Sequence, residues 1–189
     1  MFSLIKQRVG MLFLGLFVFI GAASADDNTG LNFDGVNDYV PFDALALSGS
    51  TGTIEFWLSL ETINTSNKCL VYNGTTASNG FGLYLSGGKI SVLFGGVAQY
   101  NTTYAPTLNV LTHYALSVSA TQAIVTVNGV VVFTQAITAA DTPRTPTGKL
   151  TFGQTLNNEF FDGTLDEVRI WSTARTAAEI AAKYNCKVS

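Results

Sequence analysis

Charged side chains are scarce in this sequence of 189 residues, since Asp, Glu, Lys and Arg together make up only 12% of it. The Lys and Arg residues do not cluster, so the sequence lacks the basic stripe that a nucleic-acid partner or an anionic membrane surface requires. A single histidine, His113, excludes zinc centres with two histidine ligands and leaves no evident Ser/His/Asp triad. We therefore expect no nucleic-acid partner and interpret His113 as a structural residue.

Long hydrophobic runs are confined to the N-terminus. Lys6 and Arg8 precede an apolar run, Met11–Ile20, which is followed by the small residues Ala23-Ser24-Ala25. This is the order of a signal peptide and its cleavage site. A transmembrane anchor is the alternative, but an apolar run of about ten residues would cross only about 15 Å of a hydrocarbon layer about 30 Å thick.

We therefore predict that residues 1–25 are a signal peptide and that residues 26–189 form one domain. This domain would be secreted or lie at the cell surface, periplasmic or extracellular in a bacterium, with no stable membrane insertion after cleavage. Loss of Lys6 and Arg8 leaves eight basic and 13 acidic residues, so the exported chain would carry a net charge of −5.

Only two cysteines are present, Cys69 and Cys186. In an oxidising compartment they could pair, and a loop of this length would contribute about 4 kcal/mol to stability in the chain-entropy model. Cys69 also lies in an apolar strand pattern, where a plain buried thiol is an equally good interpretation. The sequence leaves both alternatives open.

From Leu31 onward, short β-rich runs alternate with Gly, Asn, Ser and Thr, and turn signals recur every eight to twelve residues or so. This spacing predicts an all-β fold, a two-sheet antiparallel sandwich. Within Thr53–Leu60, every second residue is apolar and should face the core. These residues are Ile54, Phe56, Leu58 and Leu60.

Local signals predict three further elements. Ser86-Gly87-Gly88 and Asn128-Gly129 should each turn a hairpin, because their residues accept the positive φ angles of tight turns. The proline-containing stretch 139–148 should be a surface loop. Thr176 and Glu179 have the spacing of a capping box, which predicts a short helix ending near Tyr184. Two tryptophans in strongly patterned strands, Trp57 and Trp171, are expected in the core.

Four segments carry a family resemblance in their order and spacing. They are LNFDGVNDYV at residues 31–40, TIEFW at 53–57, TVNG at 126–129 and FDGTLDEVRIW at 161–171. Together they resemble the concanavalin A-like lectin/glucanase, laminin-G-like jelly-roll domains. The sequence departs from these domains at Leu111, where they usually carry a tryptophan.

The resemblance implies a jelly roll of two curved antiparallel sheets, in which the first and last strands are neighbours. It also implies binding or adhesion more often than catalysis, because such domains commonly recognise glycans or proteins, sometimes with calcium. Fold analogy alone does not establish a function, so the sites must be argued from individual residues.

Oxygen-bearing side chains near the first and last strands could converge on a calcium ion, which prefers six to eight oxygen ligands. The alternative is that each carboxylate folds onto the backbone of its own turn. Pentraxins, distant relatives with a paired calcium site, carry acids where this chain has Gln154-Thr155-Leu156, which argues against that particular site. The candidate calcium ligands are Asp34, Asn37, Asp38, Asp162 and Asp166.

Sugar recognition would use aromatic rings for stacking together with amide and hydroxyl groups. Several such residues occur in polar runs of the predicted sandwich. For the stretch 99–104, a half-buried edge strand is the alternative interpretation. The candidate ligand-binding residues are Tyr72, Asn73, Tyr100, Asn101, Tyr104, Asn157 and Asn158.

We interpret the chain as a secreted, non-catalytic binding or adhesion module for a glycan or an extracellular protein, with calcium ordering one rim. A structural, self-associating surface protein is the alternative, favoured by the low charge and by 23 threonines after residue 25. A retaining glycoside hydrolase is a weaker alternative, because it needs two carboxyl groups about 5 Å apart. Two such acids would have to occupy alternate positions of a strand. Asp166 and Glu167 are consecutive and so should point to opposite sheet faces, and the residue two positions after Glu55 is Trp57 rather than a second acid.

Overall fold

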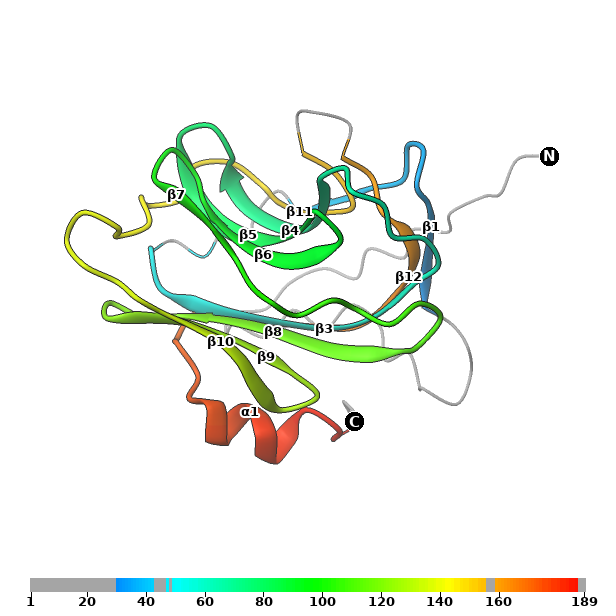
Figure 1. The fold of residues 1–189 in the computed structure, drawn as a ribbon. Coiled ribbons are helices and arrows are strands. Elements are labelled where there is room, and N and C mark those ends of the chain that lie inside the picture. Colours follow the sequence, from blue (N-terminus) through cyan, green and yellow to red (C-terminus); the bar gives the residue numbers. More distant parts are fainter. Residues whose placement is uncertain (1–29, 43–46, 48, 156–158, 187–189) are drawn as a thin grey trace.

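β-Strands are the main secondary structure of the protein in the computed structural model, which describes residues 30–42, 47, 49–155 and 159–186. Two six-stranded antiparallel sheets pack face to face, with one short helix outside them (Figure 1). The predicted all-β sandwich is therefore confirmed. The predicted signal peptide lies outside the described residues, and none of the helices described is long and apolar enough to cross a membrane.

Sheet A and sheet B divide the strands equally. Sheet A contains, in spatial order, β1 (Leu31–Asp34), β12 (Asp162–Trp171), β3 (Gly52–Leu60), β8 (Thr112–Val118), β9 (Gln122–Val127) and β10 (Val130–Ala136). Sheet B contains β2 (Val40–Phe42), β11 (Leu150–Phe152), β4 (Lys68–Thr75), β5 (Asn79–Ser86), β6 (Lys89–Phe94) and β7 (Ala98–Asn101). The first and last strands, β1 and β12, are neighbours, as the family resemblance implied.

Both predicted hairpins form. The pair β5–β6 turns through Gly87 and Gly88, and the pair β9–β10 turns through Asn128 and Gly129, all four with positive φ. Asn128 also fastens its turn to the neighbouring strand, because its side-chain oxygen accepts a hydrogen bond of 2.9 Å from the backbone amide of His113. The hairpin is thereby fixed to β8 at its tip.

The core lies between the two sheets and contains the predicted face of β3. Ile54, Phe56, Leu58 and Leu60 are all buried. Phe56 meets sheet B directly, since its ring lies edge-on to that of Phe152 at 5.7 Å between centroids. Each such buried side chain contributes about 2 kcal/mol to folding.

The outer face of sheet A is covered by the C-terminal segment and by helix α1 (Ala177–Lys183), which contacts β9 and β10 (Figure 1). The predicted capping box is present: the Glu179 amide donates to the Thr176 hydroxyl at 3.2 Å, and the Thr176 amide donates to the Glu179 carboxylate at 2.7 Å. Thr53 and Glu55, on this face of β3, are therefore fully buried.

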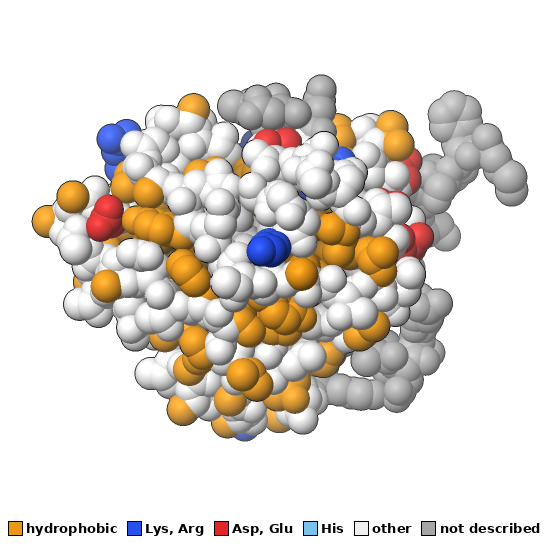
Figure 2. All heavy atoms as spheres, in the orientation of Figure 1, with side chains coloured by type: hydrophobic (Ala, Val, Ile, Leu, Met, Phe, Trp, Pro, Cys, Tyr) orange, Lys and Arg blue, Asp and Glu red, His pale blue; other side chains and the backbone are white. Residues whose placement is uncertain are grey.

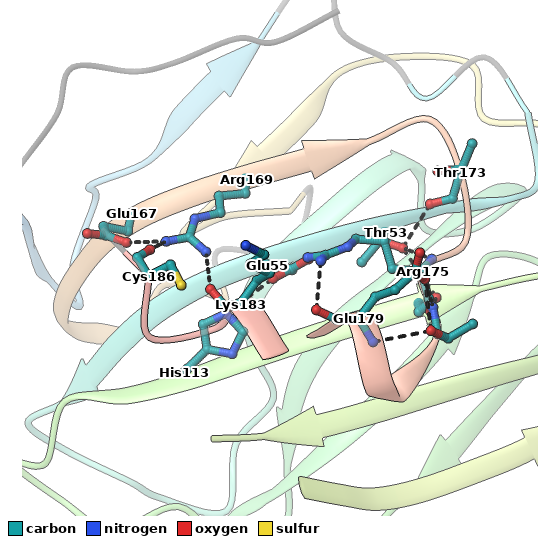
Figure 3. A network of polar contacts seen from close by, with 12 residues as sticks. Thr53, Glu55, His113, Glu167, Arg169, Thr173, Arg175, Glu179, Lys183 and Cys186 are labelled. Carbon is teal, nitrogen blue, oxygen red and sulfur yellow. Dashed lines mark hydrogen bonds and ion pairs between the residues drawn. The ribbon is translucent and has the colours of Figure 1, made fainter. Parts of the chain in front are cut away.

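A polar network anchors this covering segment to the sheet (Figure 3). The side chain of Glu55 is fully buried and accepts a hydrogen bond from Arg175, while His113 Nε2 lies 3.5 Å from its second oxygen. Arg175 also donates to the backbone carbonyl of Glu179 at 2.8 Å, inside the helix. The Thr53 hydroxyl donates to the Thr173 carbonyl at 2.9 Å and accepts from the Arg175 amide at 2.8 Å.

The expectation that Trp57 and Trp171 belong to the core is wrong. Both side chains are half-buried on the outer face of sheet A, because they alternate with the core-facing residues of their strands. The Trp57 ring packs 6.2 Å from the ring of Tyr184, and the Arg175 guanidinium lies 4.5 Å from the Trp171 ring. The tryptophans thus help to hold the C-terminal segment rather than to fill the sandwich.

Replacement of Glu55 by Gln should destabilise the fold by about 3 kcal/mol, because it leaves the Arg175 charge without its buried partner. Urea unfolding followed by tryptophan fluorescence would measure this. The matched control is Glu61→Gln, whose exposed side chain should change the unfolding free energy by less than about 0.5 kcal/mol. Equal effects of the two variants would contradict a structural role for the buried pair.

Acid should weaken the same contact. Burial raises the pKa of Glu55, but hydrogen bonds and charge from His113 and Arg175 outweigh it, so the pKa lies below the ordinary value of 4.5. Glu55 therefore stabilises the fold above that value, and this contribution is lost as the pH falls through the lower, folded-state pKa. The difference in unfolding free energy between wild type and Glu55→Gln should shrink as the pH falls from about 6 to about 3. A constant difference would exclude this titration.

Candidate functional site

A hollow of about 360 Å³ opens on the outer face of sheet B, above the edge formed by β2, β11 and β4. Its floor comes from those strands and its rim from the segments that connect them. The lining residues are Tyr39, Pro41, Tyr72, Gly74, Thr75, Thr76, Gly148, Lys149, Thr151, Gln154 and Thr155.

The lining is aromatic and polar, with Lys149 as its one charged side chain among the described residues. Tyr39, just before β2, is 51% exposed and offers an accessible ring at the hollow. Thr151 and Gln154 are half-buried and bring a hydroxyl and an amide, and no carboxylate is present among the lining residues. Rings beside hydroxyl and amide groups are the combination that suits the apolar faces and polar edges of sugars.

One side chain holds the rim in place. The side-chain oxygen of Asn79 accepts hydrogen bonds from the amides of Thr75 at 3.1 Å and Thr147 at 2.9 Å. Its side-chain nitrogen donates to the Thr147 hydroxyl at 2.8 Å. The β4–β5 turn is thus fastened to the loop that precedes β11, so this part of the rim is ordered before any ligand arrives.

Among the described residues, Tyr72 is the one predicted ligand-binding residue that lines the hollow, and it does so as part of the floor. Its side chain is only 2% exposed, and its hydroxyl donates to the Asn79 carbonyl at 2.8 Å. Burial raises the pKa of Tyr72, which keeps this hydroxyl protonated as a donor. Its role is therefore to support the rim rather than to present an open ring.

Asn73 points the other way, into the sandwich. Its register partners, Phe81 and Leu150, are core residues, because neighbouring positions of a strand face opposite sides. Asn73 is fully buried, and neither atom of its amide group has a hydrogen-bond partner. The structure does not bring it to the hollow.

The aromatic stretch around β7 also lies away from the hollow. The Tyr100 ring packs against Phe94 at 5.5 Å, and the Tyr104 ring packs against Tyr114 at 6.4 Å. The side-chain oxygen of Asn101 accepts a hydrogen bond from Ser91 at 3.0 Å. This is the half-buried edge strand that the sequence offered as an alternative. Two further candidates, Asn157 and Asn158, lie outside the described residues.

The predicted calcium ligands are only partly gathered. Asp34 and Asp162 are direct partners across β1 and β12. Among the residues described, however, no group of three or more His, Cys, Asp or Glu side chains could hold a metal ion. Calcium binding stays a prediction.

Carboxylates of this cluster accept hydrogen bonds from nearby backbone amides. Asp34 accepts a hydrogen bond from the Val36 amide at 2.8 Å and a longer one from the Asn37 amide at 3.3 Å. Asp38 accepts from the Asp34 amide at 2.9 Å, and Asp166 accepts from the Glu167 amide at 2.7 Å. These contacts agree with the alternative interpretation, in which the carboxylates bind the backbone next to them.

The two cysteines are free thiols on opposite sides of the molecule. Cys69 is buried on the outer side of sheet B beside Tyr72 and Tyr84, and burial raises the pKa of its thiol. Cys186 is exposed and follows α1 on the outer side of sheet A. The sequence left open a disulfide and unpaired thiols, and in the structure the two thiols are unpaired.

Two of the acids considered for glycoside hydrolysis are paired with arginines. Glu55 is buried under Arg175. Glu167 lies at an irregularity of β12 with a positive φ of 43° and pairs with Arg169 at 2.6 Å. The residue that sequence reasoning missed is Tyr39, whose only signal was its position in the turn after the acidic cluster.

Structures of known proteins share this arrangement of strands. Domain 4 of AbnA, a GH43 extracellular arabinanase from Geobacillus stearothermophilus solved with arabinotriose, matches with a TM-score of 0.69 at 19% identity, over 89% of this chain and 81% of that chain. The CBM40 of an IT-sialidase from Ruminococcus gnavus, bound to α2,3-sialyllactose, matches with a TM-score of 0.63 at 18% identity, over 81% and 95%. A heptameric SAP-like pentraxin from Limulus polyphemus matches with a TM-score of 0.66 at 13% identity, over 82% and 81%.

At these identities the likeness concerns the fold. No curated protein sequence matches this chain. A family model does match, and it covers residues 34–181, from the end of β1 into α1. The chain therefore belongs to the concanavalin A-like lectin/glucanases superfamily.

Proposed function

We propose that this protein is a secreted, non-catalytic carbohydrate-binding module that holds a glycan in the hollow on the outer face of sheet B. The observation that carries the proposal is the exposed ring of Tyr39 beside the hydroxyl and amide groups of Thr151 and Gln154. Two proteins of the same fold, the arabinanase domain and the CBM40, were solved with oligosaccharides, which supports a carbohydrate as the partner.

The dimensions of the hollow suit a small ligand. Its volume of about 360 Å³ lies within the range of about 300 to 1,000 Å³ typical of ligand sites. Without a carboxylate in the lining, a bound sugar would meet threonine hydroxyls and the Gln154 amide, together with one lysine, Lys149. Such polar contacts select by shape and hydrogen-bond direction.

We propose a non-catalytic role because of where the acidic side chains lie. Hydrolysis with retention requires two carboxyl groups about 5 Å apart at the sugar. The described lining residues of the hollow include no acid, and the buried Glu55 lies under Arg175 on the opposite side of the sandwich. Secretion rests on the signal-peptide pattern of residues 1–25.

Replacement of Tyr39 by Ala should weaken oligosaccharide binding about tenfold, because the ligand loses its stacking surface. Isothermal titration calorimetry against a panel that includes arabinotriose and α2,3-sialyllactose would measure it. The matched control is Val36→Ala, a more exposed residue of the same turn that does not line the hollow, and its affinity should equal that of the wild type.

Thermal unfolding should be nearly unchanged in both variants, since both side chains are largely exposed. Equal affinity of Tyr39→Ala and wild type would exclude the hollow as the site. Failure of the wild type to bind any glycan of the panel would leave adhesion to a protein as the interpretation. Repeating the titration with a chelator separates calcium-assisted binding, which would weaken, from binding that needs no metal ion.

A further inference from the structure

The two ends of the hollow on sheet B carry different side chains. Thr151 lies in its floor and is the register partner of both Pro41 and Tyr72. Tyr39 lies two residues before Pro41, and Lys149 lies two residues before Thr151. Because β2 and β11 are antiparallel, these two steps lead in opposite directions, which places Tyr39 and Lys149 about 13 Å apart along the strands. Both residues line the hollow, so one occupant that touches both must be longer than a single sugar ring.

The Lys149 end offers hydrogen-bond donors and room for a charged group. Lys149 is exposed, and its backbone is held to β4, because its carbonyl accepts a hydrogen bond from the Gly74 amide at 3.1 Å. Gly74 and Gly148 also line the hollow, and neither has a side chain that would crowd the ammonium group. An ammonium group has three N–H donors, so it can keep a contact within the chain and still donate to a ligand.

The opposite end, around Thr155, is suited to hydrogen-bond donors of a ligand. The segment after β11 runs beside Tyr39, since Gly153 lies against the backbone of the residue before it. The Thr155 hydroxyl donates its one hydrogen to the Glu159 carboxylate at 2.6 Å, so only its lone pairs remain for a ligand. Sugar hydroxyls can donate to such an oxygen, whereas an anionic group would lie close to the negative charge of Glu159. The neutral part of a glycan therefore fits at this end, and an acidic part fits at the Lys149 end.

The net charge of the whole chain does not decide this local preference. Residues 26–189 have eight basic and 13 acidic side chains, an excess of negative charge that would by itself repel an anion. Acids such as Asp34 and Glu55 belong to sheet A, however, and packed sheets lie about 10 Å apart. On the face drawn in Figure 2, charged side chains are few and scattered. Charges more than about 8 Å away are largely screened at physiological ionic strength, so among the described charges that of Lys149 counts most at its own end.

We propose that the hollow takes an acidic oligosaccharide, with a neutral ring stacked on Tyr39 and an anionic group, a carboxylate or a sulfate, bound to the Lys149 ammonium. The inference rests on the proposed function, because it names the class of glycan that the same hollow holds. Carboxylate and sulfate share the chemistry that is needed, since both present negatively charged oxygen acceptors. Lysine suits either group, because its ammonium is a compact charge without the fixed geometry of a guanidinium.

Ligands with a common neutral part test the proposal: lactose, α2,3-sialyllactose with a carboxylate, and 3′-sulfolactose with a sulfate. In isothermal titration calorimetry, the protein should bind each acidic ligand at least about fivefold more tightly than lactose, an effect of the size that an exposed ion pair provides. The preference should shrink as sodium chloride rises from about 20 to about 500 mM, because salt screens the contact.

Variants at Lys149 separate its charge from the rest of the hollow. Lys149→Gln should lower the affinity for both acidic ligands to that for lactose, while its lactose affinity should equal that of the wild type. Lys149→Arg keeps the charge and should keep the preference. The matched control is Lys89→Gln, which removes one positive charge from an exposed residue of β6 that does not line the hollow, and it should also keep the preference.

Equal affinity of the wild type for the three ligands would overturn the proposal, as would a preference that survives Lys149→Gln. A preference for the carboxylate or the sulfate ligand alone, lost in Lys149→Gln, would support it and identify the anionic group. Binding of neutral sugars that Tyr39→Ala weakens, without a preference for the acidic ligands, would overturn this inference and leave the proposed function intact. Absence of binding to every glycan would overturn both.

Discussion

A buried carboxylate decides how the C-terminal part of this chain lies. Glu55 is enclosed in the middle of sheet A, and a charge in such a place is tolerated only when it is paired and hydrogen-bonded. Arg175 supplies that partner and is itself bonded to α1 through the Glu179 carbonyl. This contact therefore holds the start of the helix against sheet A, and the covering of that face depends on it.

The consequence is a sandwich with two unlike outer faces. The outer face of sheet A is closed by the C-terminal segment, whose Tyr184 packs against Trp57 of β3 and His113 of β8. No helix of the described part of the chain covers the outer face of sheet B, which retains the hollow at β2, β11 and β4. Polar residues serve structure on the first face, whereas on the second they are arranged around an open space with an exposed tyrosine.

Elements with local signals could be predicted from the sequence, whereas contacts between distant residues could not. Positive φ angles at Asn128 and Gly129 and the capping box at Thr176 are determined within a few residues, so both patterns were sufficient. Glu55 and Arg175 are 120 residues apart, and alternation alone could not show that the outer face of β3 is covered. Tyr39 was missed for the same reason, because its partners at the hollow come from β4 and the segments around β11.

The opposed positions of α1 and the hollow determine how this domain would be presented. The helix lies beyond sheet A (Figure 1). The hollow lies beyond sheet B, so the thickness of the sandwich separates the two. A tether attached after α1, whether a polypeptide linker or an immobilising tag, would hold the domain with its hollow facing outward. The domain could therefore be displayed on a bead or a cell without obstruction of the hollow, and the same geometry makes it suitable for fusion to a catalytic partner.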